Sequence, residues 1–213
     1  MVGYRARPSA PNGAGLLIAP AFAGLRDFEM EQADLWAQKG YDVLAVDYYG
    51  DGWRTDVVSE AAAKMAEVQA DRPRFLRRVQ GALAQMDAGK VGAFGFCLGG
   101  KAVLDLARSG QGDAVVSLHG VYDRPPYETQ TMPPVLLCHG WNDPLASPAQ
   151  FTEMAAELEA HCPDWHALTF GQTGHAFTNP ANASDGGDMG YVPVSARRSW
   201  AAVEAFLTEH LLS

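Results

Sequence analysis

Residues 91–101 are V-G-A-F-G-F-C-L-G-G-K, an apolar run that leads into a cysteine between two glycines. The run at 91–94 predicts a buried strand, and residues 98–108 predict a helix that Gly110 ends. Glycines two positions before and after Cys97 suit a sharp strand-to-helix turn, where larger side chains clash. The stretch predicts one strand–turn–helix unit, with Cys97 as either a nucleophile or a small buried residue.

The same alternation of apolar runs and amphipathic segments extends in both directions from this unit. Further strands are predicted at 15–19, 42–46, 113–118, 134–138 and 166–170. Further helices are predicted at 27–39, 59–70, 73–88, 151–160 and 196–211. Strands that alternate with helices indicate an α/β fold with a mostly parallel central sheet and helices on both faces. We expect a single domain over residues 1–213.

The composition of the 213 residues disfavours several classes of protein. The formal net charge of −9 opposes binding to the phosphate backbone of nucleic acids. No apolar run approaches the roughly 20 residues of a membrane-spanning helix. Residues 1–15 contain no apolar segment typical of a signal peptide. We therefore expect a cytoplasmic protein with neither a nucleic-acid nor a membrane partner.

The three cysteines, Cys97, Cys138 and Cys162, are too few for a disulfide framework, and their number is odd. Cys138 and His139 are adjacent, so on a strand they point to opposite faces. The sequence contains no C-x-x-C or H-x-x-x-H pair. We expect no metal site and no cofactor.

Three reactive residues each follow a predicted strand, at the sheet edge where the sites of α/β proteins collect. They are Cys97, Asp143 in C-H-G-W-N-D, and His175 in G-Q-T-G-H. The chain order nucleophile, acid, histidine is that of α/β hydrolases. The start of the helix after Cys97 favours a thiolate and leaves the Leu98 amide free to bind an oxyanion. We interpret the three residues as a catalytic triad.

Each member of this set also has an ordinary structural explanation. Cysteine is among the most buried residue types. An aspartate before a proline often begins a turn, and a histidine after a glycine is often a surface residue. The order of the three residues, each at a predicted strand end, favours the triad.

The remaining histidines and the arginines are interpreted as structural. We expect two histidines near strand ends to shape the site, His119 and His139. We expect three at the surface or at helix ends: His161, His166 and His210. The four closely spaced arginines predict a solvated helix face rather than an anion site: Arg72, Arg74, Arg77 and Arg78. Residues 179–194, rich in Gly, Asp and Pro, predict a lid or a pocket rim.

The motifs G-F-C-L-G-G, H-G-W-N-D and G-H-A-F resemble those of the dienelactone hydrolase family of α/β hydrolases. The stretch G-Y-D-V-L-A-V-D-Y-Y-G resembles the family's strand and loop after its first crossover helix. The resemblance implies that Cys97 is the nucleophile, that His175 is the general base and then acid, and that Asp143 orients His175. It also implies an oxyanion hole made of the amides of Leu98 and Phe22, the latter in A-P-A-F-A-G-L.

Some positions depart from the family's pattern. Members that cleave dienelactone carry a glutamate in the early loop, which holds the cysteine in a protected resting state, and the matching residue here is Ala21. They also bind the substrate carboxylate with an arginine four residues after the histidine, where this chain has Asn179. Glu29 and Glu31 are nearby carboxylates, and the opening strands are reduced to residues 2–7. These departures favour an ester or lactone other than dienelactone.

We therefore predict a hydrolase that cleaves a small ester or lactone through a thioester on Cys97, as a monomer or a homodimer. Four aromatic residues beside the site loops are expected, with Phe22, to line the substrate pocket: Tyr49, Tyr122, Trp141 and Phe177. The alternative is a non-catalytic or redox-responsive ligand-binding protein on the same fold, which has no need of Asp143 and His175. Isomerase or dehalogenase chemistry is a third possibility, but dehalogenases of this fold use a carboxylate nucleophile.

Overall fold

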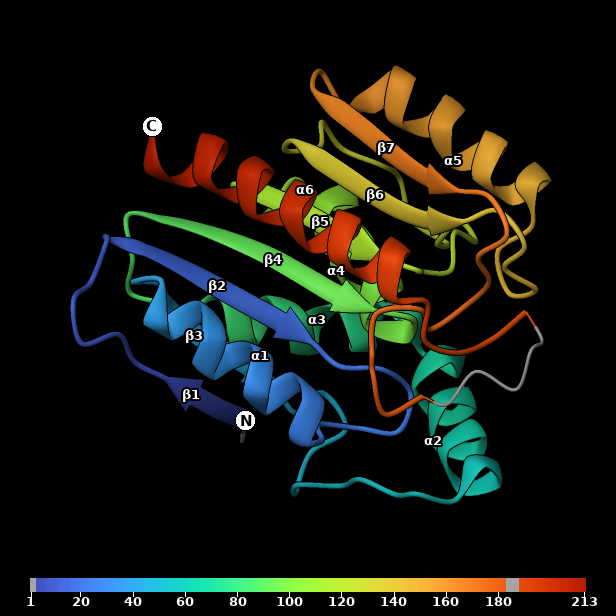
Figure 1. Cartoon of the computed structure of the whole chain (residues 1–213), viewed down its shortest axis with the longest axis horizontal. Coiled ribbons are helices and arrows are strands. Elements are labelled where there is room, and N and C mark those ends of the chain that lie inside the picture. Colours follow the sequence, from blue (N-terminus) through green and yellow to red (C-terminus); the bar gives the residue numbers. More distant parts are fainter. Residues whose placement is uncertain (1–2, 183–187) are drawn as a thin grey trace.

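Figure 1 shows the computed structural model of the protein, which describes residues 3–182 and 188–213. Within these residues seven strands form one sheet: β1 (Gly3–Ala6), β2 (Ala14–Ala19), β3 (Asp42–Val46), β4 (Lys90–Phe96), β5 (Ala114–Leu118), β6 (Val135–Gly140) and β7 (Trp165–Phe170). The helices between and after them are α1 (Asp27–Gln38), α2 (Val58–Ala70), α3 (Arg72–Leu83), α4 (Leu98–Arg108), α5 (Pro148–His161) and α6 (Pro193–Leu212). The α/β-hydrolase architecture expected from the sequence is confirmed.

The sheet has the strand order β1-β3-β2-β4-β5-β6-β7. β1 runs antiparallel to β3, and every other neighbouring pair is parallel. The central strand β2, of sequence A-G-L-L-I-A, is buried at all six positions. A strand that is covered on both faces has a continuous apolar sequence, because neither face is exposed to water.

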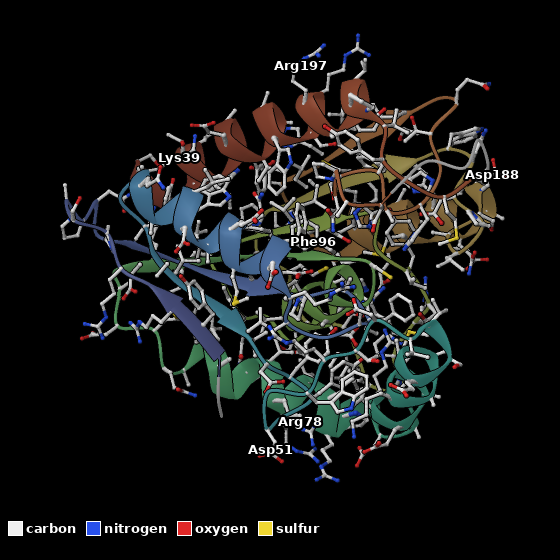
Figure 2. All side chains as sticks on the ribbon, turned by 60° about the horizontal axis from the view of Figure 1, so that its bottom comes forward. Lys39, Asp51, Arg78, Phe96, Asp188 and Arg197 are labelled. Atoms are coloured by element: carbon white, nitrogen blue, oxygen red, sulfur yellow. The ribbon has the colours of Figure 1, made fainter. Side chains whose placement is uncertain are left out.

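Two hydrophobic cores lie on the two faces of the sheet. α1 and α6 cover one face, where Trp36, Phe94 and Phe206 pack together. α3, α4 and α5 cover the other, and α2 packs outside them against α3. Figure 2 shows Phe96 in the interior and Arg197 pointing outward from α6. The predicted three-layer arrangement follows from amphipathic helices that bury one side each.

The strand order creates a switch point beside β2. The chain leaves β2 toward β3 and leaves β4 toward β5, which lies on the opposite side, so these two connections turn in opposite directions. In open α/β sheets a crevice forms at such a point, outside the carboxyl ends of the strands. The loop after β2 and the turn after β4 both lie at this edge.

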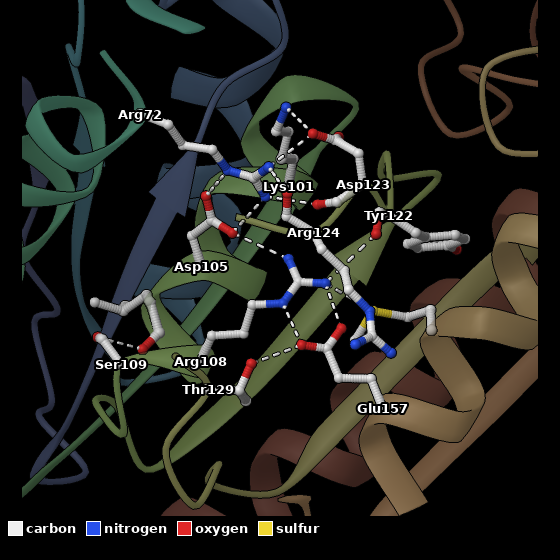
Figure 3. Close-up of polar contacts among 12 residues, drawn as sticks. Arg72, Lys101, Asp105, Arg108, Ser109, Tyr122, Asp123, Arg124, Thr129 and Glu157 are labelled. Atoms are coloured by element: carbon white, nitrogen blue, oxygen red, sulfur yellow. Dashed lines mark hydrogen bonds and ion pairs between the residues drawn. The ribbon is translucent and has the colours of Figure 1, made fainter. Parts of the chain in front are cut away.

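The helix after Cys97, α4, is buried along its whole length although it carries three charged residues: Lys101, Asp105 and Arg108. Buried charges need partners, and Figure 3 shows them. Arg72 of α3 donates to the two Asp105 oxygens at 2.6 and 2.8 Å. Arg108 donates to Asp105 at 3.0 Å and to Glu157 of α5 at 2.8 Å. This buried ion cluster ties α3, α4 and α5 together.

The arginine run is only partly a solvated face, which corrects the sequence prediction. Two of its members are exposed, Arg74 and Arg77. Arg72 is buried in the ion cluster, and Arg78 donates to the Tyr48 carbonyl oxygen at 2.7 Å. The prediction was wrong for Arg72 because its carboxylate partners lie in α4 and in the loop after β5, which the pattern of α3 alone does not reveal.

All predicted helices and strands are present, and the differences lie at their ends. α5 begins at Pro148, three residues earlier than expected, because Ser147 caps it. The Ser147 hydroxyl accepts from the Gln150 amide, and the Gln150 side chain accepts from the Ser147 amide, a reciprocal cap followed by proline at the first helical position. No helix of the described residues combines the length and apolar character needed to cross a bilayer.

Candidate active site

The turn between β4 and α4 holds Cys97 at φ 54° and ψ −114°, a backbone conformation that L-residues rarely adopt. The glycines around it have no room for a side chain. A Cβ on Gly99 would lie 2.0 Å from the Ala19 carbonyl oxygen, and one on Gly95 would lie 2.3 Å from the Gly99 oxygen. The Cys97 amide donates to the Leu118 carbonyl at 3.1 Å. The turn is thereby fixed at the carboxyl edge of the sheet.

Asp143 and His175 meet at the same edge, from the loops after β6 and β7. Nδ1 of His175 lies 2.7 Å from Oδ2 of Asp143, and both side chains are buried. The Leu145 amide donates to the other carboxylate oxygen at 2.8 Å. A carboxylate only accepts, so this contact keeps the proton on Nδ1 and leaves Nε2 for chemistry.

Cys97 and His175 line the same cavity. Burial by itself lowers the pKa of His175, but negative charge on Cys97 and the hydrogen bond to Asp143 outweigh burial and raise this pKa to about 10. Among the described residues, Nε2 of His175 has no hydrogen-bond partner. The charge of a thiolate favours an imidazolium beside it. A negative charge on Cys97 would therefore stabilise the charged form of His175.

His119 packs directly against His175, closer than its sequence position indicated. The ring centroids of the two histidines are 5.1 Å apart. Nε2 of His119 lies 2.8 Å from the Thr178 hydroxyl. Burial, and then the charge of His175, hold the pKa of His119 well below its usual range. The neutral ring of His119 lines the site and does not compete for the proton of His175.

The two amides predicted as oxyanion donors are both unengaged. Leu98 is the first residue of α4, and Phe22 lies in the loop between β2 and α1. Within residues 3–182 and 188–213, neither amide has a hydrogen-bond acceptor. Phe22 and Cys97 line the same cavity.

A cavity of about 1000 Å³ opens beside these groups. Cys97, His119 and His175 form part of its lining, together with Phe22. Residues from the segment 179–194 contribute to it as expected of a rim: Asn179, Ala181, Asn182, Met189 and Gly190. Residues 183–187 of that predicted rim lie outside the described residues.

The prediction that four further aromatic residues line the pocket beside Phe22 is wrong. Phe177 is fully buried in the core beneath α6. Tyr122 and Tyr49 are buried in the opposite core, and Trp141 is 45% exposed outside the cavity. All four are adjacent in sequence to site loops, but the direction of each side chain depends on the packing of the whole domain.

The two arginines at the cavity each have an aspartate partner. Arg26 contacts Asp56, and Nη1 of Arg54 lies 4.0 Å from Oδ1 of Asp27. The side-chain oxygen of Asn179 accepts from the Ala181 amide at 2.9 Å. The described lining thus holds no arginine without a carboxylate partner. The described residues also contain no group of three or more side chains suited to a metal ion.

Comparisons with known proteins identify the family of the chain. The model of the dienelactone hydrolase family matches residues 1–211. The solved structure of m3DLH has a TM-score of 0.86 at 30% identity, over 95% of this chain and 89% of that one. A dienelactone hydrolase-like promiscuous phosphotriesterase from metagenomic libraries has a TM-score of 0.83 at 30% identity, over 95% and 88%.

A curated relative from Bradyrhizobium sp. is similar over nearly the whole length of both proteins. It is a probable 2-oxo-3-(5-oxofuran-2-ylidene)propanoate lactonase, 22% identical over 229 residues, which cover 98% of this chain and 89% of the relative. The family match spans nearly the whole chain, and the fold and the strand-end residues agree with it. The chain therefore belongs to the dienelactone hydrolase family.

Proposed function

We propose that the protein hydrolyses a small, uncharged ester or lactone by forming a thioester on Cys97. The observation that carries this proposal is a cysteine in a strained turn that faces a buried histidine–aspartate pair. Such backbone strain costs on the order of 1–3 kcal/mol and persists mainly at functional sites. A protein that only binds a ligand has no use for the pair of Asp143 and His175.

In the first half-reaction the Cys97 thiolate attacks the acyl carbon of the substrate. The amides of Phe22 and Leu98 bind the oxyanion of the tetrahedral intermediate, and one such donor contributes about 3–4 kcal/mol where it has been measured. Nε2 of His175 then gives its proton to the leaving alkoxide. The carbon–oxygen bond breaks, and the acyl group remains on the sulfur.

In the second half-reaction His175 acts as the base. Its neutral Nε2 takes a proton from a water molecule, which attacks the thioester carbon. The thiolate leaves, and the acid departs from the cavity. Asp143 keeps Nδ1 protonated in both steps and stabilises the imidazolium.

The charges of the cavity favour an uncharged substrate. Its two arginines each contact an aspartate. A substrate carboxylate would meet no unpaired cation among the described lining residues. The lactonase activity in the name of the Bradyrhizobium relative supports a lactone or ester as the substrate class.

The direct test is intact-mass spectrometry of the protein mixed with p-nitrophenyl acetate and stopped early in acid. We expect one acetyl group on Cys97, which disappears as turnover proceeds. Peptide mapping assigns the modified residue. Release of nitrophenol without acetylation of Cys97 would contradict the thioester mechanism. A protein that binds the ester without acetylation or turnover would support the alternative, a ligand-binding protein.

At pH 7 iodoacetamide is expected to alkylate Cys97 faster in the wild type than in His175→Ala. The pKa of His175 is raised to about 10, and a positive charge beside a sulfur favours the thiolate, which is the form that reacts. His175→Ala removes that charge. Mass spectrometry of the labelled peptide measures the rate.

Cys138 and Cys162 serve as internal controls in the alkylation experiment. Burial raises the pKa of Cys138 to about 12, and it raises the pKa of Cys162 as well. Both should remain unlabelled. Equal alkylation rates for wild type and His175→Ala would show that the imidazole does not activate Cys97.

A further inference from the structure

The loop between β2 and α1 carries the Phe22 amide, and its neighbouring peptide groups are held by side chains from other elements. The Tyr48 hydroxyl lies 2.8 Å from the Pro20 carbonyl oxygen and 2.9 Å from that of Ala21. The Tyr49 hydroxyl donates to the Phe22 carbonyl at 2.8 Å. Both tyrosines follow β3, so the neighbouring strand fixes the conformation of this loop.

One of these contacts bears directly on the oxyanion donor. The Ala21 carbonyl and the Phe22 amide belong to the same peptide plane. In a trans peptide the C=O and N–H point in opposite directions. A hydroxyl that holds the Ala21 oxygen therefore sets the direction of the Phe22 N–H. The same contact polarises the peptide group, which makes its N–H a stronger donor.

Glu29 of α1 holds the other side of Ala21. Its Oε1 accepts from the Ala21 amide at 3.4 Å, and its Oε2 accepts from the Arg26 amide at 3.2 Å. The carboxylate lies at the cavity and is 4% exposed, whereas a glutamate in the first turn of a helix is usually solvated. Burial raises the pKa of Glu29, and the two backbone amides oppose that rise.

We propose that Tyr48 and Glu29 are positioning residues for ester hydrolysis: Tyr48 holds the peptide between Ala21 and Phe22, and Glu29 holds the preceding one, so that the Phe22 N–H meets the oxyanion. Neither side chain takes part in bond making. Tyr48 is 1% exposed, and its ring packs edge-on against Phe75 at 5.0 Å. Its hydroxyl can therefore be removed while the ring remains in place. The inference rests on the proposed function, since it assigns a role within that reaction.

The test compares Tyr48→Phe with Tyr41→Phe, a change of another buried tyrosine on the opposite face of the sheet. For p-nitrophenyl acetate we expect kcat and the acetylation rate of Cys97 to fall about 10- to 100-fold in Tyr48→Phe, with KM nearly unchanged. Loss of an oxyanion donor itself costs about 10²–10³-fold, and a misdirected donor costs less. Tyr41→Phe should keep the wild-type rates.

Alkylation by iodoacetamide separates positioning from general damage, because that reaction develops no oxyanion. Tyr48→Phe should alkylate at the wild-type rate while its acetylation is slow. Glu29→Gln should show the same split, with Glu31→Gln, at an exposed position of the same helix, as its control. Equal acetylation rates in Tyr48→Phe and Tyr41→Phe, or equal losses of acetylation and alkylation, would overturn the inference. Absence of acetylation in the wild type would overturn the proposed function and the inference with it.

Discussion

Cys97→Ala is expected to hydrolyse p-nitrophenyl acetate no faster than buffer does. Without the sulfur no thioester forms, so hydrolysis can no longer proceed as two easier steps, acylation and deacylation. Removal of a nucleophile that acts together with its histidine lowers kcat by about 10⁴-fold or more. Steady-state release of nitrophenol measures the change, and circular dichroism checks that the variant is folded.

Two further cysteine variants make this result specific. Cys97→Ser should keep weak activity, because the hydroxyl is far less readily ionised beside His175 than a thiol. Cys162→Ser is the control, since the Cys162 sulfur donates to the carbonyls of Pro133 and Asp164, each at 3.1 Å, which a hydroxyl can also do. It should hydrolyse the ester at the wild-type rate. Wild-type activity in Cys97→Ala would exclude the thioester.

Asp105→Asn should lower the free energy of unfolding by about 3–5 kcal/mol, the usual cost of removing one partner from a buried ion pair. Asp105 is 1% exposed and accepts from both Arg72 and Arg108. The amide of asparagine carries no charge, and its NH₂ group is a donor that faces the guanidinium donors of Arg72 and Arg108. Both arginines thereby lose one carboxylate partner. Urea unfolding followed by tryptophan fluorescence at pH 7 measures the loss.

Glu67→Gln is the matched control for this experiment. Oε2 of Glu67 lies 2.8 Å from Nζ of Lys64 in an exposed ion pair, and the change to glutamine removes the negative charge of that pair. Exposed pairs contribute little because water already solvates both charges. The unfolding midpoint should therefore hardly move. A similarly small change in Asp105→Asn would show that the buried ion cluster does not hold α3, α4 and α5 together.

Much of the fold could be predicted because its signals are local. The apolar runs of β2 and β4, and the glycines that end α1 and α4, are visible in consecutive residues. The position of Cys97 between strand and helix followed from the same stretch. The close approach of Gly99 to the Ala19 carbonyl gives the physical reason why this turn admits no larger residue.

The substrate pocket could be predicted much less well. Tyr122 and Phe177 stand next to site residues in the sequence, yet both are buried in the cores. The adjacency of two residues does not fix the direction of a side chain, which depends on the elements that pack around it. In the sequence Glu29 is only a nearby carboxylate: its contact with the Arg26 amide is a local helix cap, but its contact with the Ala21 amide depends on the path of the loop.

The sequence by itself determined the alternation of strands and helices, the sharp turn at Cys97, and the chain order of Cys97, Asp143 and His175. These depend on the spacing of apolar residues and on glycines, which act over a few positions. Only the tertiary structure decided that Tyr48 holds the oxyanion loop, that Arg72 is buried, and which residues line the cavity. Those features join groups about 30 or more residues apart, and contacts at such separations exist only after the sheet has brought its strands side by side.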